Sequence, residues 1–417
     1  MTLSPLQHGL SLYLHIPFCR TRCTYCDFNI YTNLRHLYQP YTEALCLEVE
    51  RTLAAVVRRD YNPLAPLSLV SETGDALPPL DIETVFLGGG TPSLLSPMLL
   101  ERIMTSIRRY GTIREDAEIT LEANPGTLNL EKLKTLRAIG INRLSYGAQT
   151  FDDAQLKKLG RAHDSAEIGR SFALAREAGF DNLSLDFIYG LPGETLESWR
   201  DTLDKALALE AEHLSLYGLI VEENTSLGKR VLAGKLPLPE DDTAADMYLL
   251  ALEKLAQAGY LQYEISNWAR GSLEKYASRH NLTYWLNRPY IGFGPGAHSC
   301  FAGYRFAVIK DPREYIQRIQ TGESVIDNTE AEEVTPELKR TDTVILAWRT
   351  NAGLDLQAFE AEFGKSLDEF YPGKVARFLE LGLLEEGFNA VGNPILRLTV
   401  RGRLLSNNVF VEFLPDV

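Results

Sequence analysis

The chain has 417 residues, of which 45% are apolar and 24% charged, and its formal net charge is −14. This composition is typical of a globular protein of two or three domains, and the negative charge argues against a nucleic-acid partner. No apolar run is long enough to cross a bilayer, and the first residues lack the basic start of a secretory signal peptide. Because cysteine is also sparse, with five residues, we expect a cytoplasmic protein.

Six short apolar segments with the character of buried strands recur from the N-terminus to about residue 219. They are residues 11–16, 83–87, 118–121, 143–148, 183–188 and 213–219. Stretches with helical periodicity alternate with them, at residues 41–58, 97–110, 130–139, 164–178, 195–209 and 241–258. Alternating strands and helices predict an α/β fold with a parallel sheet of right-handed β-α units. Six units are too few for a closed eight-stranded barrel, so we expect an open three-quarter barrel.

The rest of the chain divides into three regions. Residues 61–80 are rich in Pro, Ser and Gly and predict a surface loop. Residues 260–302 are dense in aromatic residues, glycine and histidine. From residue 331 to 417, three helical stretches and a strand resemble a winged-helix module, which we expect to serve as a lid or docking domain because acidic side chains outnumber basic ones there. We therefore predict two domains, 1–330 (including 260–302) and 331–417.

The most informative motif is a loop directly after the first predicted strand, where Cys19, Cys23 and Cys26 form a C-x-x-x-C-x-x-C array. Thiolates select zinc, copper(I) or iron–sulfur clusters. A structural zinc site normally uses four ligands, and no second C-x-x-C pair exists in the chain. A disulfide is disfavoured by the odd number of cysteines. A 4Fe-4S cluster on three cysteines is favoured, and it would leave one iron open to another ligand; zinc is the alternative.

The array resembles the signature of the radical S-adenosylmethionine (SAM) proteins, in which the open iron chelates SAM. The longer stretch Y-L-H-I-P-F-C is similar, more narrowly, to the oxygen-independent coproporphyrinogen III oxidase family. The oxidase itself is expected to carry a further cysteine two residues after the third. Phe28 occupies that position here, which resembles the haem-chaperone branch of the family. The resemblance thus implies a 4Fe-4S cluster, SAM and haem as cofactors, with an electron donor for the cluster.

The same resemblance implies which residues surround SAM. A glycine-rich segment after the second predicted strand would meet its amino group, and Arg161 would bind its carboxylate through two parallel hydrogen bonds. The complete predicted set is Tyr13, Tyr25, Gly89, Gly90, Thr91, Glu122, Gln149, Arg161 and Asp186. Taken singly, these residues would more often have structural roles. Several of the polar ones nevertheless follow or end predicted strands, and ligands of parallel barrels bind at that edge.

A second motif, H-N-x-x-Y-W, comprises His280, Asn281, Tyr284 and Trp285. Imidazole is a common axial ligand of haem iron, and aromatic rings can flank a porphyrin. From the residues alone, a surface histidine beside a packed Tyr–Trp pair is the simpler interpretation. The resemblance to the haem-chaperone branch instead implies haem binding at His280.

These observations predict a haem chaperone that passes haem to an acceptor, expected to be a respiratory haem protein at the membrane. The alternative is the oxidase of porphyrin biosynthesis. In that enzyme the reduced cluster would cleave SAM to a deoxyadenosyl radical, which would oxidatively decarboxylate two propionates of coproporphyrinogen III. Phe28 argues against the oxidase.

Overall fold

The computed structural model describes residues 9–64 and 79–415. Most of the loop predicted at 61–80 therefore lies outside the described residues. The chain divides into two compact units, Met1–Lys254 with Pro289–Glu332 and Leu255–Arg288 with Glu333–Val417. The predicted domain boundary at residue 330 stays a prediction. The compact units differ from it because Leu255–Arg288 groups with the C-terminal part of the chain.

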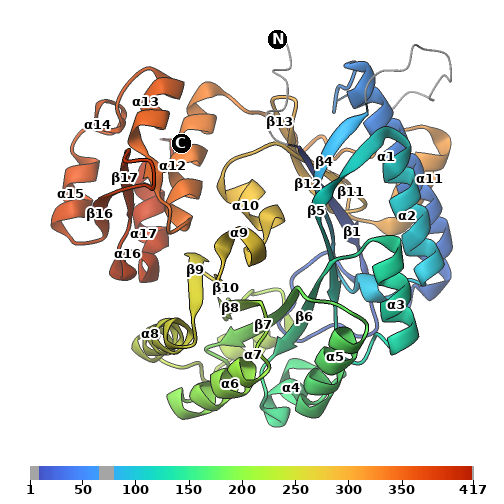
Figure 1. Cartoon of the computed structure of the whole chain (residues 1–417), viewed down its shortest axis with the longest axis horizontal. Coiled ribbons are helices and arrows are strands. Elements are labelled where there is room, and N and C mark those ends of the chain that lie inside the picture. Colours follow the sequence, from blue (N-terminus) through green and yellow to red (C-terminus); the bar gives the residue numbers. More distant parts are fainter. Residues whose placement is uncertain (1–8, 65–78, 416–417) are drawn as a thin grey trace. The chain divides into compact units, whose positions relative to one another are not determined.

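A parallel sheet forms the centre of the first unit (Figure 1). Its barrel strands, in hydrogen-bonded order, are β1 (Leu10–Ile16), β4 (Leu80–Gly89), β5 (Gly111–Ala123), β6 (Arg143–Gln149), β7 (Leu183–Tyr189) and β8 (His213–Gly218). Each neighbouring pair is parallel. Six of the seven residues of β1 are buried, as expected for a parallel strand with both faces covered. The sheet confirms the predicted fold class, an open α/β barrel of six strands.

Four short strands extend this sheet beyond β1, and the outermost is β14 (Glu332–Glu333), which pairs with β13. The strand β11 (Tyr290–Phe293) runs parallel to β1, and β12 (His298–Phe301) and β13 (Tyr304–Ala307) continue the sheet in antiparallel pairs. We did not predict these strands. The strands β11, β12 and β13 have four residues each and β14 has two, which is too short for an alternating pattern to stand out from the surrounding residues.

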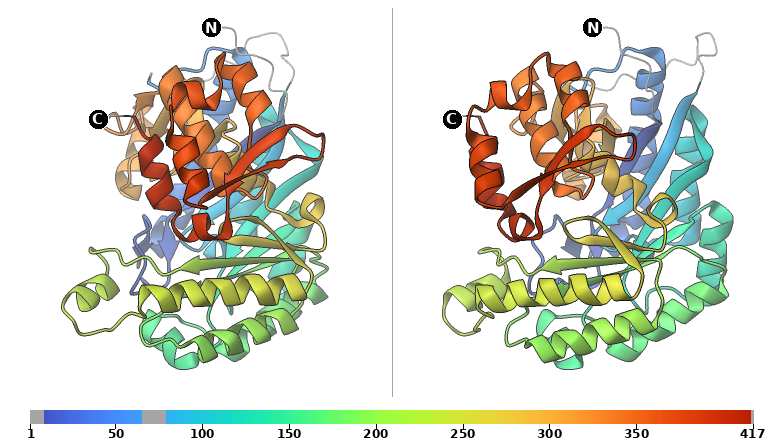
Figure 2. Two further views of the ribbon diagram at one scale, coloured as in Figure 1. Left: turned by 90° about the vertical axis from the view of Figure 1, so that its left-hand side faces the viewer. Right: turned by 60° about the vertical axis from the view of Figure 1, so that its left-hand side comes forward.

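The connecting helices cover the outer face of the sheet (Figure 1). They are α1 (Tyr38–Arg58), α2 (Pro97–Tyr110), α3 (Leu130–Ile139), α4 (Asp153–Leu159), α5 (Ser165–Glu177), α6 (Leu196–Ala208) and α11 (Pro312–Thr321). The helix α7 (Ser226–Leu232) lies instead against the loop after β1, where Leu227 N–H donates to Thr24 O. The predicted helices 97–110 and 130–139 coincide with α2 and α3, whose starts are fixed by the side-chain caps Ser96 and Asn129. The helix α8 (Asp241–Gln257) lies beside α6, and Trp199 Nε1 donates to Met247 O between them (Figure 2).

The second unit packs around Trp348, Phe359, Phe378 and Phe413, all at most 3% exposed. Its helices are α9 (Leu273–Tyr276), α10 (Arg279–Trp285), α12 (Pro336–Arg349), α13 (Leu356–Phe363), α14 (Leu367–Phe370), α15 (Lys374–Glu380), α16 (Val400–Leu404) and α17 (Ser406–Phe410). Its strands are the pair β9 (Tyr260–Glu264) and β10 (Asn267–Arg270), and a small sheet of β15 (Leu354–Asp355), β17 (Pro394–Leu398) and β16 (Leu384–Phe388). Helices beside a β16–β17 hairpin match the expected winged-helix-like arrangement. Among the described residues, none of the helices has the length and apolar character to span a membrane.

Leu14 provides a test of the sheet core, because it is fully buried in β1 and pairs with both β4 and β11. Leu14→Ala should lower the free energy of unfolding by about 2–5 kcal/mol, since the truncation removes buried methyl groups and leaves a cavity. Leu47 lies on α1 and is 39% exposed. Leu47→Ala should change the free energy of unfolding by less than about 1 kcal/mol. Urea unfolding of the full chain compares the two, and equal losses would contradict the assignment of β1 to the core.

Candidate metal and cofactor site

The three cysteines lie on the loop that leaves β1. At its base, β2 (Phe18–Cys19) pairs in parallel with β3 (Tyr31–Thr32), and Tyr31 N–H donates to Pro17 O at 2.7 Å. Arg22 Nη2 donates to Ile30 O at 2.8 Å. These hydrogen bonds close the cysteine loop, which we define as residues 17–31.

The apex of the cysteine loop is tied to two distant helices. Thr24 N–H donates to Leu159 O at 2.9 Å, and Leu227 N–H donates to Thr24 O at 2.7 Å. Leu159 is the last residue of α4, and Leu227 lies in the first turn of α7. The position of the cysteines therefore depends on chain segments more than 130 residues further on.

All three thiols of the loop are free and half-buried. Cys19 Sγ lies 3.4 Å from Thr91 Oγ1, and Arg161 Nη1 lies 3.5 Å from Cys23 Sγ. Burial raises the pKa of Cys19 to about 11 and also raises the pKa of Cys26. These two thiols are therefore protonated near neutral pH in the metal-free chain, and metal binding must release their protons.

Among the described residues, no three His, Cys, Asp or Glu side chains lie close enough to bind one metal ion. A four-iron cluster makes a different demand, because each thiolate binds a separate iron atom.

The strand ends and the cysteine loop enclose a cavity of about 730 Å³. The predicted site residues that line it are Cys19, Cys23, Tyr25, Cys26, Gly89, Gly90, Thr91, Glu122, Gln149, Arg161 and Asp186. Two predicted residues lie elsewhere. Tyr13 is on β1 and is absent from the lining; its hydroxyl lies 2.9 Å from His15 Nδ1. His280 belongs to the second unit.

Gly90 brings the end of β4 against the start of the cysteine loop. Its N–H donates to Ile16 O at 2.9 Å, and Thr91 N–H donates to Phe18 O at 2.8 Å. A Cβ at Gly90 would lie only 2.7 Å from Phe18 O and 2.8 Å from Ile16 O. Glycine is required here because two backbone segments touch. The sequence motif thus has a structural reason independent of any ligand.

Two carboxyl groups line the cavity, that of Glu122 on β5 and that of Asp186 on β7. Gly89 N–H donates to Glu122 Oε2 at 3.0 Å, while Asp186 accepts hydrogen bonds from the hydroxyls of Ser145 and Ser184. Burial, and then the nearby Asp186 carboxyl, raises the pKa of Glu122 to about 7. Burial also raises the pKa of Asp186. Glu122 can therefore exchange a proton with a ligand near neutral pH.

Arg161, which also lines the cavity, is held in place by Gly147 O, at 2.7 Å from Nη2, and by the side chain of Asn124. Its buried Nε has no partner among the described residues. Asn124 Nδ2 also donates to Thr91 Oγ1 at 3.0 Å. We did not predict Asn124; the available signal was its position two residues after Glu122, immediately before a proline.

Gln149 occupies the left-handed backbone region, with φ of 69°, at the end of β6. Few residues other than glycine adopt this conformation, and those that do cluster at functional sites. Gln149 therefore reaches the cavity from a strained backbone position.

Three apolar side chains surround the cavity opening, and we refer to Phe28, Tyr217 and Ile220 as the apolar rim. They line the cavity yet are 69%, 44% and 73% exposed, respectively. Grouped exposed apolar side chains of this kind mark ligand or partner sites more often than isolated ones do.

The H-N-x-x-Y-W residues make contacts inside the second unit. His280 is 2% exposed, and its Nε2 lies 2.8 Å from the hydroxyl of Tyr284. The guanidinium of Arg349 stacks 4.6 Å above the ring of Trp285. Haem ligation by His280 stays a prediction, and ligation through Nε2 would require this nitrogen to give up its hydrogen bond with Tyr284.

Comparisons with known proteins identify the family. Residues 13–206 match the radical SAM superfamily model, and residues 334–405 match the HemN C-terminal domain model. A Bacillus subtilis (strain 168) protein named heme chaperone HemW is 39% identical over 408 residues, covering 98% of this chain and 100% of that protein. This chain belongs to the HemW family of radical SAM proteins. The predicted resemblance is thereby confirmed.

Other relatives agree with the HemW assignment. The heme chaperone HemW of Escherichia coli (strain K12) is 37% identical over 69% of both chains. The mouse protein named radical S-adenosyl methionine domain-containing protein 1, mitochondrial, is 41% identical over 70% of this chain and 60% of its own. The structure of E. coli coproporphyrinogen III oxidase (HemN) matches with a TM-score of 0.77 at 24% identity, over 97% of this chain and 90% of that one. This last match shows a shared fold.

We expect Gly90→Ala to destabilise the first unit by about 1–3 kcal/mol, because the new methyl group would overlap the carbonyl oxygens of Ile16 and Phe18. The matched control is Gly169→Ala in the interior of α5, where a Cβ would meet nothing within 4 Å. This control should be neutral or stabilising by about 0.5–1 kcal/mol. Thermal unfolding of the metal-free full chain measures both, and an unchanged midpoint for Gly90→Ala would contradict the close approach.

Proposed function

We propose that this protein is a haem chaperone that carries a 4Fe-4S cluster and SAM at the strand ends of the first unit and hands haem to an acceptor protein. The observation that carries the proposal is Phe28. It is 69% exposed at the cavity wall, two residues after the third cysteine, where the oxidase is expected to have a further cysteine. The full-length relatives named heme chaperone HemW support the same function.

Cys19, Cys23 and Cys26 would hold the cluster. The residues present fit this group, because three free thiols on one loop face a cavity with a guanidinium 3.5 Å from Cys23 Sγ. A cluster carried on three thiolates would be anionic, and the positive charge of Arg161 would stabilise it. When bound, the cluster supplies one-electron reduction, for which an electron donor is required.

SAM would lie in the same cavity, and each kind of group in its amino-acid part and ribose has a suitable partner. Arg161 would bind the carboxylate, for which its unpartnered buried Nε is available. Glu122, Asp186 and Gln149 would bind the amino and hydroxyl groups. Gly89, Gly90, Thr91, Tyr13 and Tyr25 would complete the surroundings of SAM.

Haem is a flat apolar macrocycle with two propionates, and the apolar rim offers it a matching surface. Arg20 lines the same cavity and is exposed, so its guanidinium can pair with a propionate. His280 is proposed as an axial ligand on the basis of the motif. The apolar rim and His280 belong to different units, so their contacts with haem are tested separately. The proposed acceptor is a respiratory haem protein at the membrane, reached from the cytoplasm without a nucleic-acid partner.

The chaperone and oxidase functions are separated by one pair of assays on the anaerobically reconstituted protein. Added haem should give a stable Soret band with defined stoichiometry. Coproporphyrinogen III with SAM and a reductant should give no protoporphyrinogen, since Phe28 stands where the oxidase is expected to have cysteine. E. coli HemN is the positive control for the second assay. Formation of protoporphyrinogen by this chain would overturn the chaperone proposal.

The place of haem binding is tested with variants of the two proposed contacts. The triple variant Phe28→Ala, Tyr217→Ala, Ile220→Ala should weaken haem binding by about tenfold or more, because the macrocycle would lose apolar contact area. Phe388→Ala with Val391→Ala, at positions 77% and 82% exposed on the β16–β17 hairpin, is the matched control and should bind as the native chain does. Loss of the ligand-field spectrum in His280→Ala would support axial ligation. Unchanged haem titrations in both the triple variant and His280→Ala would contradict both contacts.

Glu122 should make SAM binding depend on pH. Burial raises its pKa to about 7, so the carboxylate form grows from about a tenth at pH 6 to about three quarters at pH 7.5. SAM is cationic at its sulfonium and ammonium groups, so its affinity should rise several-fold over this range. The measurement is equilibrium dialysis of SAM against the reconstituted protein.

Glu122→Gln should abolish this rise in SAM affinity. The control is Glu194→Gln, whose carboxyl group also has a pKa raised to about 7 by burial but does not line the cavity. A rise that persists in Glu122→Gln would show that another group controls SAM binding.

A further inference from the structure

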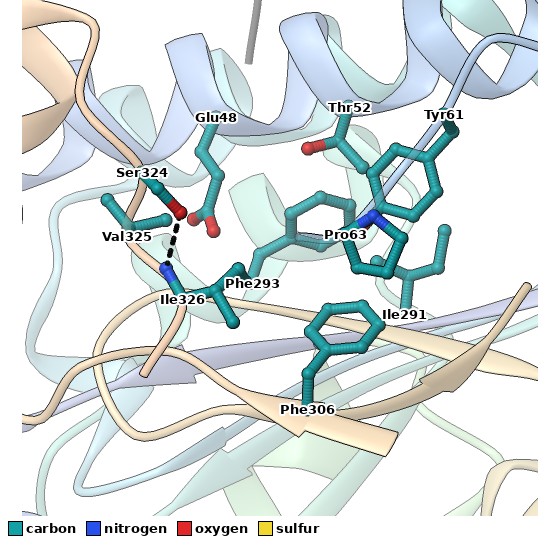
Figure 3. Close-up of a pocket in the computed structure, with 11 residues that line it drawn as sticks. Glu48, Thr52, Tyr61, Pro63, Ile291, Phe293, Phe306, Ser324, Val325 and Ile326 are labelled. Carbon is teal, nitrogen blue, oxygen red and sulfur yellow. Dashed lines mark hydrogen bonds between the residues drawn. The ribbon is translucent and has the colours of Figure 1, made fainter. Parts of the chain in front are cut away.

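Glu48 on α1 is 3% exposed, although carboxylic acids are rarely buried. Its Oε2 accepts hydrogen bonds from Gly294 N–H at 2.9 Å and from Tyr315 O–H at 2.5 Å. Figure 3 shows the carboxyl group pointing from α1 into a small cavity of about 20 Å³, which is room for about one water molecule. Glu48 does not line the large cavity at the strand ends, so the proposed cofactors do not explain its burial.

Gly294 connects Glu48 to the end of β1. It has a φ of +87°, and a Cβ there would lie 2.7 Å from both His15 O and the hydroxyl of Tyr41. The Tyr41 hydroxyl itself donates to His15 O. By fixing the N–H of Gly294, Glu48 therefore fixes a segment packed against the last residues before the cysteine loop.

The residues after Gly294 extend this contact to the far end of the cysteine loop. Asn29 Nδ2 donates to Pro295 O at 2.9 Å and to Lys310 O at 3.0 Å. The carbonyl of Asn29 accepts a hydrogen bond from His15 Nε2–H at 2.9 Å. His15 and Asn29 lie on either side of the three cysteines in sequence, so residues 294–296 hold both sides of the loop that bears them.

We propose that Glu48 is a positioning residue for the cysteine loop: it anchors Gly294, and the 294–296 segment in turn holds His15 and Asn29 so that the three thiols keep the spacing required by the cluster. The requirement is a buried acceptor oxygen at this point. A glutamine supplies one, whereas a leucine of similar volume does not. The expected effect on the cluster rests on the proposed function. The hydrogen bonds of Glu48 are present in the chain without a cluster, so the positioning of the loop can be tested by itself.

The first test follows hydrogen exchange in the metal-free full chain. Glu48→Leu should increase the exchange rates of the Tyr31 and Gly90 amides, which donate within and onto the cysteine loop, by about tenfold or more. Glu48→Gln should keep them close to native values. The control is Leu53→Ala, a fully buried position on the same helix, which should lower the unfolding midpoint without selective exchange at these amides.

The second test measures cluster loss in the reconstituted protein, as iron and sulfide released per chain during exposure to a chelator. Glu48→Leu should release the cluster several-fold faster than the native chain, and Glu48→Gln at about the native rate. Tyr315→Phe, which removes one of the two donors to Glu48, should give a smaller change in the same direction and serves if Glu48→Leu does not fold. If the rate of cluster loss in these variants and in Leu53→Ala correlates only with their unfolding midpoints, the proposal is overturned.

A double variant tests the path through Asn29. If Glu48 acts through Asn29, adding Asn29→Ala to Glu48→Leu should increase amide exchange little beyond the larger single effect. If the double variant instead shows the product of the two single increases in exchange rate, Glu48 and Asn29 act independently, and the path through Asn29 is overturned. Absence of a cluster in the native chain would defeat the proposed function, while the exchange experiment would still decide the role of Glu48.

Discussion

The arrangement of the candidate site depends on one backbone contact, the approach of Gly90 to the carbonyl oxygens of Ile16 and Phe18. This contact joins the end of β4 to the loop that leaves β1, and it places the cysteines at the carboxyl edge of the sheet. The cavity, the carboxyl groups and the apolar rim all lie along that edge. Even a methyl group would separate the two segments, so the glycine motif is first a requirement of the fold.

The cavity combines charges that are unfavourable without a ligand. Glu122 and Asp186 are acidic groups whose pKa values are raised by burial, while Arg161 keeps a buried Nε without a partner in the described structure. A zwitterionic ligand with a carboxylate and a cationic centre would satisfy both sides. These buried groups lower the stability of the protein without a ligand. Ligand binding would restore that stability, as expected for a preorganised site.

Much of the fold could be predicted because β-α units repeat a strong local pattern. The helices α2 and α3 begin at capping residues visible in the sequence, and each of the six barrel strands contains a short run of buried residues. The strands β11 to β13 could not be predicted, since four residues carry too little periodicity. The roles of Asn124 and Glu48 depend on partners between 33 and 267 positions away, and sequence spacing does not report such pairs. For His280 the sequence shows the motif but does not show that the side chain is buried.

The ties on Thr24 have a consequence for biogenesis. Its backbone is bonded to Leu159 and Leu227, and its loop is further held by Pro295 through Asn29. The thiols are encoded in the first 26 residues, yet their native spacing requires segments synthesised much later. A nascent chain emerging from the ribosome therefore exposes its cysteines long before they can be organised. The three thiols can therefore acquire the spacing that they have in the folded loop only after translation has passed Pro295.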